Sequence, residues 1–340
     1  YYHEAKDGAT LEEGITEAGA MGSFIAAGTS HAGCGIDTVP FFLFYSMFGF
    51  QRVGDLIWAA ADARARGFLI GATSGRTTLS GEGLQHCDGQ SHIYALSNPA
   101  VMAYDPTYAY EVAVIVREGL RRMYVEREDV FYYLTVINEK YRMPPMPEGV
   151  EQGILNGMYR LTGADGEEQP TVHLLGSGAI LREAIQAGEL LKADYGIAAD
   201  VWSVTGYKPL YDNACQAERK ARLNGKQAEK SYIEAYFPEE GHTFIAASDY
   251  LKALPLTVAK WFRGDFTALG TDGFGRSDDR PELRAFFEVD HRHIAFAALA
   301  ALDRQDKLEE GVLDKARKAL DIDPQKADPA APYSKPTNNE

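Results

Sequence analysis

Apolar residues follow helical spacing and strand spacing in turn along the first part of the chain. Residues 11–29 place apolar side chains three or four positions apart, which predicts a helix. Within it, residues 18–27 are apolar or small on nearly every side, which predicts a helix buried on most sides. The unbroken apolar run at residues 40–45 predicts a strand covered on both faces, and helical spacing returns at residues 47–60.

The same alternation continues up to a proline-dense segment at residues 142–149. Asp105 and Pro106 have the residue types of a helix N-cap and a first helical residue. Strands alternating with helices indicate a doubly wound α/β domain with a parallel sheet, which we assign to residues 1–150. Its further predicted elements are strands at 67–71, 101–104 and 129–137 and a helix at 108–124.

A second α/β pattern starts after residue 150 and predicts another doubly wound domain over residues 151–326. Prolines and a polar end predict a disordered tail at residues 327–340. The elements predicted in the second domain are strands at 158–161, 172–175, 201–205, 243–247 and 266–269, with helices near 180–191, 215–223, 251–261 and 294–302.

The overall composition narrows the class of protein. A length of 340 residues agrees with two domains, and a formal net charge of −15 argues against non-specific nucleic-acid binding. No apolar run is long enough to predict a membrane-spanning helix. Three unpatterned cysteines fit a reducing compartment, so we expect a cytoplasmic protein. Because the chain starts with Tyr1 and no leader pattern, we expect its start to be an internal cut.

Residues 71–92 form a long glycine-rich segment with almost no core-forming side chains. A loop of this length inside a compact domain is usually functional or disordered. The segment lacks the charge excess and the prolines of a linker, which favours a functional loop. It gathers side chains that accept, donate or transfer protons, namely Arg76, Glu82, His86, Asp88 and His92.

Glu17 precedes Met21 and Phe24 by four and seven positions, so the three side chains share one face of a helix. A carboxyl group there would point into an apolar interior, where desolvation raises its pKa and favours the protonated form. Alternatively, Glu17 simply ends an exposed acidic first turn with Glu12 and Glu13, which is favourable at a helix N-terminus.

Tyr45 and Phe48 fall where a predicted strand ends and a helix begins. Ligands of open α/β sheets bind at the carboxyl ends of strands, so these two rings could form a stacking surface for a planar ligand. The alternative is that both rings belong to the hydrophobic core.

The glycine-rich turn at residues 176–178 follows a predicted strand and resembles part of a dinucleotide fingerprint. Leu181 replaces the third glycine and no acidic residue ends the next strand, which favours a simple tight turn. A nucleotide-binding oxidoreductase that uses this turn is the rival enzyme interpretation.

A second glycine-rich loop, residues 270–278, fits a salt-bridged structural loop or an interface. Residues 290–293 predict the polar start of a helix, not a zinc site.

Several ordered segments resemble one known family. They read Tyr-Ser-Met-Phe-Gly-Phe-Gln-Arg (45–52), Gly-Arg-Thr-Thr-Leu (75–79), Gly-Glu-Gly-Leu-Gln-His (81–86), Ala-Tyr-Asp-Pro (103–106) and Gly-Thr-Asp-Gly-Phe-Gly-Arg-Ser-Asp (270–278). Together they resemble the homodimeric type of pyruvate dehydrogenase, the decarboxylating first component of the pyruvate dehydrogenase complex. The resemblance extends over about residues 1–322.

This resemblance implies a transketolase-like architecture, in which a pyrimidine-binding middle domain precedes a transketolase C-terminal-like domain. It also implies thiamine diphosphate and a divalent metal, usually Mg²⁺, as cofactors. The family's Gly-Asp-Gly segment followed by asparagine binds metal and diphosphate in a further upstream domain, and the present sequence has no such segment. We therefore expect no metal ligands in this chain, half of a cofactor site, and no activity from this chain alone.

The resemblance implies a role for each candidate residue. Glu17 matches the acid at the ring nitrogen of the aminopyrimidine, and Tyr45 and Phe48 match the aromatic pocket around that ring. His86 matches a histidine near the substrate carbonyl. Glu82 matches a carboxylate that organises His86 or the active-site channel.

The implied partners are pyruvate, a second copy of the chain in a homodimer, and the lipoylated dihydrolipoyl acetyltransferase core that receives the acetyl group. No nucleic-acid or membrane partner is expected. Cys87 and Gln90 depart from the family pattern, which has a carboxylate and a histidine at these positions. A non-catalytic dimerisation or assembly module is the rival interpretation from outside the enzymes.

Overall fold

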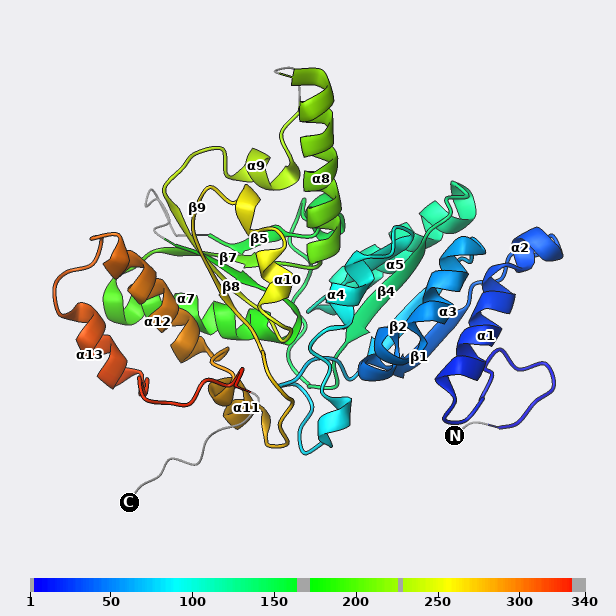
Figure 1. The fold of residues 1–340 in the computed structure, drawn as a ribbon, viewed down its shortest axis with the longest axis horizontal. Coiled ribbons are helices and arrows are strands. Elements are labelled where there is room, and N and C mark those ends of the chain that lie inside the picture. The colour runs from blue at the N-terminus through cyan, green and yellow to red at the C-terminus, as the bar shows by residue number, and fades with distance from the viewer. Residues whose placement is uncertain (1–2, 164–171, 226–228, 332–340) are drawn as a thin grey trace.

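The computed structural model describes residues 3–163, 172–225 and 229–331. Two α/β units lie side by side, the first coloured blue to cyan and the second green to red (Figure 1). Each unit has its own sheet with helices packed against it, which is the predicted arrangement of two consecutive α/β domains.

The first unit has a parallel four-stranded sheet in the order β1-β2-β4-β3. Side chains alternate between its faces, so Tyr133 of β4 packs with Phe44 and Phe50 while Phe68 and Tyr132 face the opposite side. The strands are β1 (Phe41–Tyr45), β2 (Phe68–Ala72), β3 (Val101–Tyr104) and β4 (Phe131–Val136), and the helices are α1 (Glu17–Gly28), α2 (Ser30–Gly33), α3 (Phe50–Asp62), α4 (Ser91–Leu96) and α5 (Ala109–Leu120).

Helix α5 packs closely on the second of these faces. A Cβ added to Gly119 would come within 2.7 Å of the Phe68 ring and 3.2 Å of the Tyr132 ring, so glycine allows the helix to approach the sheet. Helices α1 and α3 pack against each other on the first face, where Phe24 contacts Phe131 edge to face.

The second unit has a five-stranded sheet in the order β5-β7-β6-β8-β9, in which only β5 is antiparallel. Leu174 enters the core beneath α7 and α12, and the next residue, Leu175, enters the core beneath α8. The strands are β5 (Tyr159–Thr162), β6 (Val172–Gly176), β7 (Ala199–Ser203), β8 (His242–Ala247) and β9 (Gly264–Leu269); the helices are α6 (Glu151–Asn156), α7 (Leu181–Tyr195), α8 (Tyr207–Asn224), α9 (Tyr232–Tyr236), α10 (Ala253–Leu256), α11 (Arg280–Phe286), α12 (His291–Arg304) and α13 (Val312–Ala319).

Two expectations for the start of the chain are wrong. Helix α1 begins at Glu17 rather than at residue 11, because the Thr16 side chain accepts a hydrogen bond from the Gly19 N–H and caps the helix there. The helix is also not buried on most sides: only Met21, Phe24 and Gly28 of its twelve residues are buried. Its small residues therefore leave much of its surface exposed.

The expectation that the strand at residues 40–45 is covered on both faces is also wrong. β1 is an edge strand, and Phe41, Leu43 and Tyr45 are 49%, 65% and 46% exposed. These three side chains lie on a face of β1 that no described element covers fully.

The second unit contains two further differences. The helix predicted at 251–261 is divided into α10 and a 3-10 turn at Ala259–Trp261. The predicted tail at 327–340 begins with a turn in which Ala331 N–H donates to Asp328, and Pro329 contacts Gly273. Residues 332–340 lie outside the described residues. The predicted polar start of a helix is confirmed, since Asp290 caps α12.

Glu111 on α5 connects the two units. Its carboxylate is fully buried and accepts hydrogen bonds from the Thr107 and Tyr108 N–H groups and from the hydroxyls of Tyr159 and Ser203. Tyr108, not Asp105, is the N-cap of α5, so the predicted Asp-Pro cap is wrong.

Asp105 instead fills the glycine-rich turn of the second unit. A Cβ on Gly178 would lie 2.4 Å from Asp105 Oδ2, and the Gly178 N–H donates to the Asp105 carbonyl at 3.2 Å. The turn that resembles a dinucleotide fingerprint is therefore occupied by a side chain of the first unit. This packing weighs against the rival interpretation as a nucleotide-binding oxidoreductase.

We expect the Asp105→Asn variant to gain stability relative to the parent as the pH rises. Burial raises the Asp105 pKa to about 7, while Thr135 donates to this carboxyl at 2.6 Å. Because the folded-state pKa lies above the ordinary value of 3.8, the folded protein binds this proton more tightly, and the resulting stability is present in acid and lost as the pH rises through about 7. Asparagine has no such proton, so the difference in unfolding free energy should shift by about 2–3 kcal/mol between pH 5 and pH 8.

Urea unfolding of both proteins at each pH measures this difference. Burial lowers the pKa of His92, which contacts Thr135, to about 4. The lowered His92 pKa makes stability rise with pH, which is opposite to the effect of Asp105. Both proteins contain His92, so its contribution cancels in the comparison. A difference that does not change with pH would contradict the prediction.

Candidate active site

Glu17 is the first residue of α1 and faces α3. Its Oε2 atom lies 2.9 Å from a guanidinium nitrogen of Arg52, and its side chain is 14% exposed. The expected apolar interior around Glu17 is therefore wrong: the carboxyl group lies in the first turn of α1 and pairs with a half-exposed cation.

Tyr45 and Phe48 lie at the carboxyl end of β1, as predicted. The chain turns sharply here, since a Cβ on Gly49 would come within 2.2 Å of the Phe44 ring. The two rings meet edge to face with centroids 6.1 Å apart. Tyr45 is half exposed, so this pair forms a surface and is not simply part of the core.

His86 lies on this aromatic surface although it is far along the chain. Its ring centroid is 5.0 Å from that of Tyr45 and 5.3 Å from that of Phe48. His86 Nδ1 is 3.7 Å from Glu82 Oε2, beyond hydrogen-bond distance, and is buried without a hydrogen-bond partner. The structure therefore brings together His86, Glu82 and both rings.

Arg52 joins Glu17 to this group, a connection that the sequence analysis missed. Its guanidinium carbon lies 4.1 Å from the centroid of the Phe48 ring, while the same group bonds Glu17. The available signal was the spacing of four residues between Phe48 and Arg52, which places side chains on one side of a helical turn. The site thus extends continuously from Glu17 to His86.

Two other polar residues of the 71–92 segment, Asp88 and His92, are buried and hydrogen-bonded. The buried Asp88 carboxylate accepts from Gln51 Nε2 at 2.7 Å and from the Ser91 N–H at 3.0 Å, which holds the start of α4 against α3. His92 is buried against Tyr133 and Tyr250 and bonds Thr135. None of these contacts involves Tyr45, Phe48 or His86.

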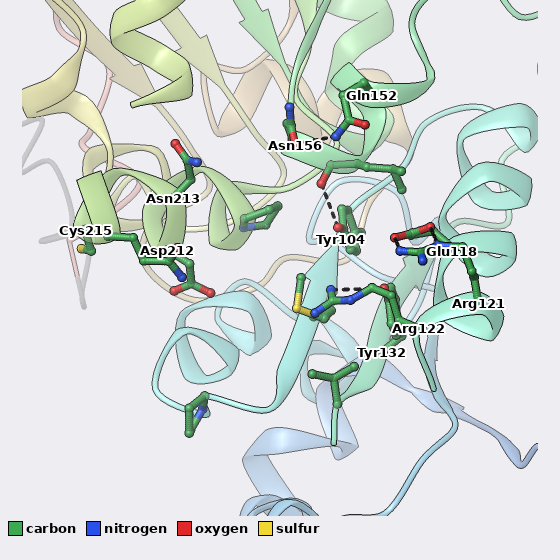
Figure 2. Close-up of a pocket in the computed structure, with 16 residues that line it drawn as sticks. Tyr104, Glu118, Arg121, Arg122, Tyr132, Gln152, Asn156, Asp212, Asn213 and Cys215 are labelled. Atoms are coloured by element: carbon green, nitrogen blue, oxygen red, sulfur yellow. Dashed lines mark hydrogen bonds and ion pairs between the residues drawn. The ribbon is translucent and has the colours of Figure 1, made fainter. Parts of the chain in front are cut away.

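A polar groove of about 840 Å³ lies elsewhere, between the edge of the first sheet and α8 (Figure 2). Both basic side chains that line it are paired: Arg121 with Glu118 at 2.8 Å, and Arg122 with Glu128 at 2.6 Å. None of the predicted site residues lines this groove. Within residues 3–163, 172–225 and 229–331, no three His, Cys, Asp or Glu side chains are arranged to hold a metal ion, and no helix has the length and apolar content to cross a membrane.

The chain has a transketolase-like fold. Transketolase from Campylobacter jejuni matches it with a TM-score of 0.59 and 16% identity over 81% of this chain and 38% of that one. A structure described as a split gene transketolase, inactive beta4 tetramer, matches with a TM-score of 0.58 and 16% identity over 85% of this chain and 82% of that one. At these identities the likeness concerns the fold alone.

Sequence comparison then defines the family. The model of the pyruvate dehydrogenase E1 component middle domain matches residues 1–144, and that of the transketolase-like C-terminal domain matches residues 157–290. The chain belongs to the pyruvate dehydrogenase E1 component family. Proteins named pyruvate dehydrogenase E1 component from Pseudomonas aeruginosa and Escherichia coli are 51% and 47% identical to it over 97% of its length. The chain spans 38% and 37% of the length of these relatives.

Proposed function

We propose that this chain contributes the pyrimidine side of the active site in a thiamine-diphosphate-dependent pyruvate dehydrogenase. The observation that carries the proposal is the continuous group of Glu17, Arg52, Phe48, Tyr45 and His86 at the carboxyl end of β1. The names of the relatives support the choice of substrate. The chain's small share of their length makes the activity of the whole protein part of the proposal.

The residues present fit the aminopyrimidine part of this cofactor. Tyr45 is half exposed and offers a ring face for stacking. The Arg52 guanidinium contacts both the Glu17 carboxyl and the Phe48 ring, so the carboxyl lies near the aromatic pair. An aminopyrimidine needs an aromatic surface on which its ring can stack and a carboxyl group that can hydrogen-bond its ring nitrogen. These side chains include both kinds of group. We propose that the diphosphate and Mg²⁺ are held by a further segment.

When bound, thiamine diphosphate supplies a carbon nucleophile and an electron sink for decarboxylation of a 2-oxo acid. Glu17 would hold a proton at the ring nitrogen, and Tyr45 and Phe48 would fix the plane of the ring and exclude water from it. His86 would donate to the carbonyl oxygen of pyruvate, with Glu82 orienting its imidazole. Arg52 would orient the Glu17 carboxyl.

We further propose that the acetyl group passes to the lipoyl group of the acetyltransferase core, and that the chain self-associates. The exposed apolar side chains of β1, Phe41 and Leu43, adjoin Tyr45 and support a partner surface beside the site. Mass measurement of the whole protein tests the dimer.

Replacing Phe48 with alanine in the whole enzyme is expected to weaken thiamine diphosphate binding by about tenfold. The substitution removes half of the stacking surface and the ring on which the Arg52 guanidinium packs. Calorimetric titration with the cofactor measures the affinity. Trp58→Ala, which removes an exposed ring from the same helix region, should leave it unchanged. Equal affinity for all three proteins, or binding of NAD in place of thiamine diphosphate, would contradict the proposal.

A further inference from the structure

We infer that the second unit positions His86, through a loop at residues 270–278 that we name the clamp loop. The inference rests on the proposed function, since it concerns the geometry of the same site. Three separate contacts connect the clamp loop to the segment that carries His86, and Asp249, two residues after the end of β8, adds a fourth. From the sequence, residues 270–278 fit only a salt-bridged structural loop or an interface.

The first contact is the buried guanidinium of Arg76. It donates to the Gly273 carbonyl at 2.6 Å and to the Thr271 carbonyl, so one side chain of the first unit bonds two backbone oxygens of the second. Burial lowers the Arg76 pKa, and the neighbouring charge of Asp88 opposes part of this lowering. Gly89 packs directly on the guanidinium, since a Cβ there would lie 2.5 Å from Arg76 Nε.

The second and third contacts flank His86. The Gly81 N–H donates to the Asp278 carbonyl at 3.1 Å. Gly275 lies against Cys87, the residue after His86: a Cβ on Gly275 would come within 2.4 Å of Cys87 Cβ and 3.3 Å of the Leu84 carbonyl. Burial raises the pKa of the Cys87 thiol, so this side chain acts by packing as a neutral group.

Asp249 anchors the beginning of the same segment. Its buried carboxylate accepts from the Thr77 N–H at 2.9 Å and from the Thr78 hydroxyl at 2.7 Å. Gly75 has φ +85 and packs on it, since a Cβ would lie 2.1 Å from Asp249 Oδ2. A buried carboxylate is thus paired with donors from the first unit.

These contacts matter because the segment cannot fix its own geometry. Between the end of β2 and His86 its only regular element is the 3-10 turn at Leu84–His86, so its internal hydrogen bonds are few. The clamp loop and Asp249 provide external partners at both ends of the segment. Gly275 and Arg76 are therefore positioning residues for His86, although neither contacts its ring.

We expect Gly275→Ala in the whole enzyme to push Cys87 and His86 out of place and to lower kcat for pyruvate by about ten- to hundredfold, with unchanged thiamine diphosphate affinity. The double variant Gly275→Ala with Cys87→Gly removes the clashing atoms and should recover most of the loss. Gly54→Ala, at a helical glycine with open space around it, is the matched control.

Arg76→Lys keeps the charge but loses the paired bonds and should reproduce the kcat loss, whereas the exposed Arg64→Lys should not.

Backbone hydrogen exchange provides a readout that does not depend on activity. Both Gly275→Ala and Arg76→Lys should speed exchange at residues 81–92 and leave residues 131–136 of β4 unchanged. Unchanged exchange in both variants would overturn the inference whether or not the enzyme decarboxylates pyruvate. A kcat loss that the double variant does not recover would also overturn it. An inactive parent with the expected exchange pattern would instead reject the proposed function and leave the clamp supported.

Discussion

Glu17→Gln in the whole enzyme is expected to lower thiamine-dependent decarboxylation of pyruvate by about 10²–10⁴-fold, the range of an acid-base catalyst. The amide oxygen can still accept from Arg52, which bonds the Glu17 carboxyl at 2.9 Å, so the helix and its contact with α3 should persist. An amide cannot hold or release the proton that the proposal places at the ring nitrogen. Steady-state assays with saturating cofactor measure the loss.

Glu12→Gln is the matched control because it makes the same change of charge at an exposed position five residues away. Its rate should equal that of the parent. Full activity in Glu17→Gln would remove the proposed acid and leave only a helix-terminal ion pair with Arg52.

Glu111→Ala is expected to lower the free energy of unfolding by about 3–5 kcal/mol. The substitution removes the shared acceptor of four buried donors, two of which come from the second unit, Tyr159 and Ser203. Burial raises the pKa of Glu111, and its four donors oppose that rise. Urea unfolding of the variant and the parent measures the difference.

The control for this prediction is Glu118→Ala on the same helix. Glu118 makes a surface ion pair with Arg121 at 2.8 Å, and such pairs contribute about 0–1 kcal/mol. If both variants lose the same small amount, Glu111 does not hold the two units together.

The candidate residues were predictable because the motifs that carry them are local. Tyr45 and Phe48 follow an apolar run that becomes β1, and the change from strand to helix at that point locates the carboxyl end of the strand. The family resemblance assigned His86 to the same active site without a contact to these rings, and the structure brings the three rings together. The chemical roles of these residues remain predictions.

Other features could not be predicted because a pattern does not state what covers it. The unbroken apolar run of β1 predicts burial on both faces, yet its position at the sheet edge leaves Leu43 exposed. Glu17 has the spacing of an inward-facing residue, but Thr16 caps the helix just before it and Arg52 reaches its carboxyl.

The sequence by itself determined two consecutive α/β units, the position of most strands, and the residue types gathered in the 71–92 segment. These depend on periodicity and on neighbours in the chain, which a sequence displays directly. Only the tertiary structure decided that Asp105 fills the turn at Gly178, that Arg52 joins Glu17 to Phe48, and that Arg76 is held by Thr271, a residue 195 positions away. Such contacts arise when separate elements pack together, because burial then requires each polar group to find a partner wherever the fold brings one near.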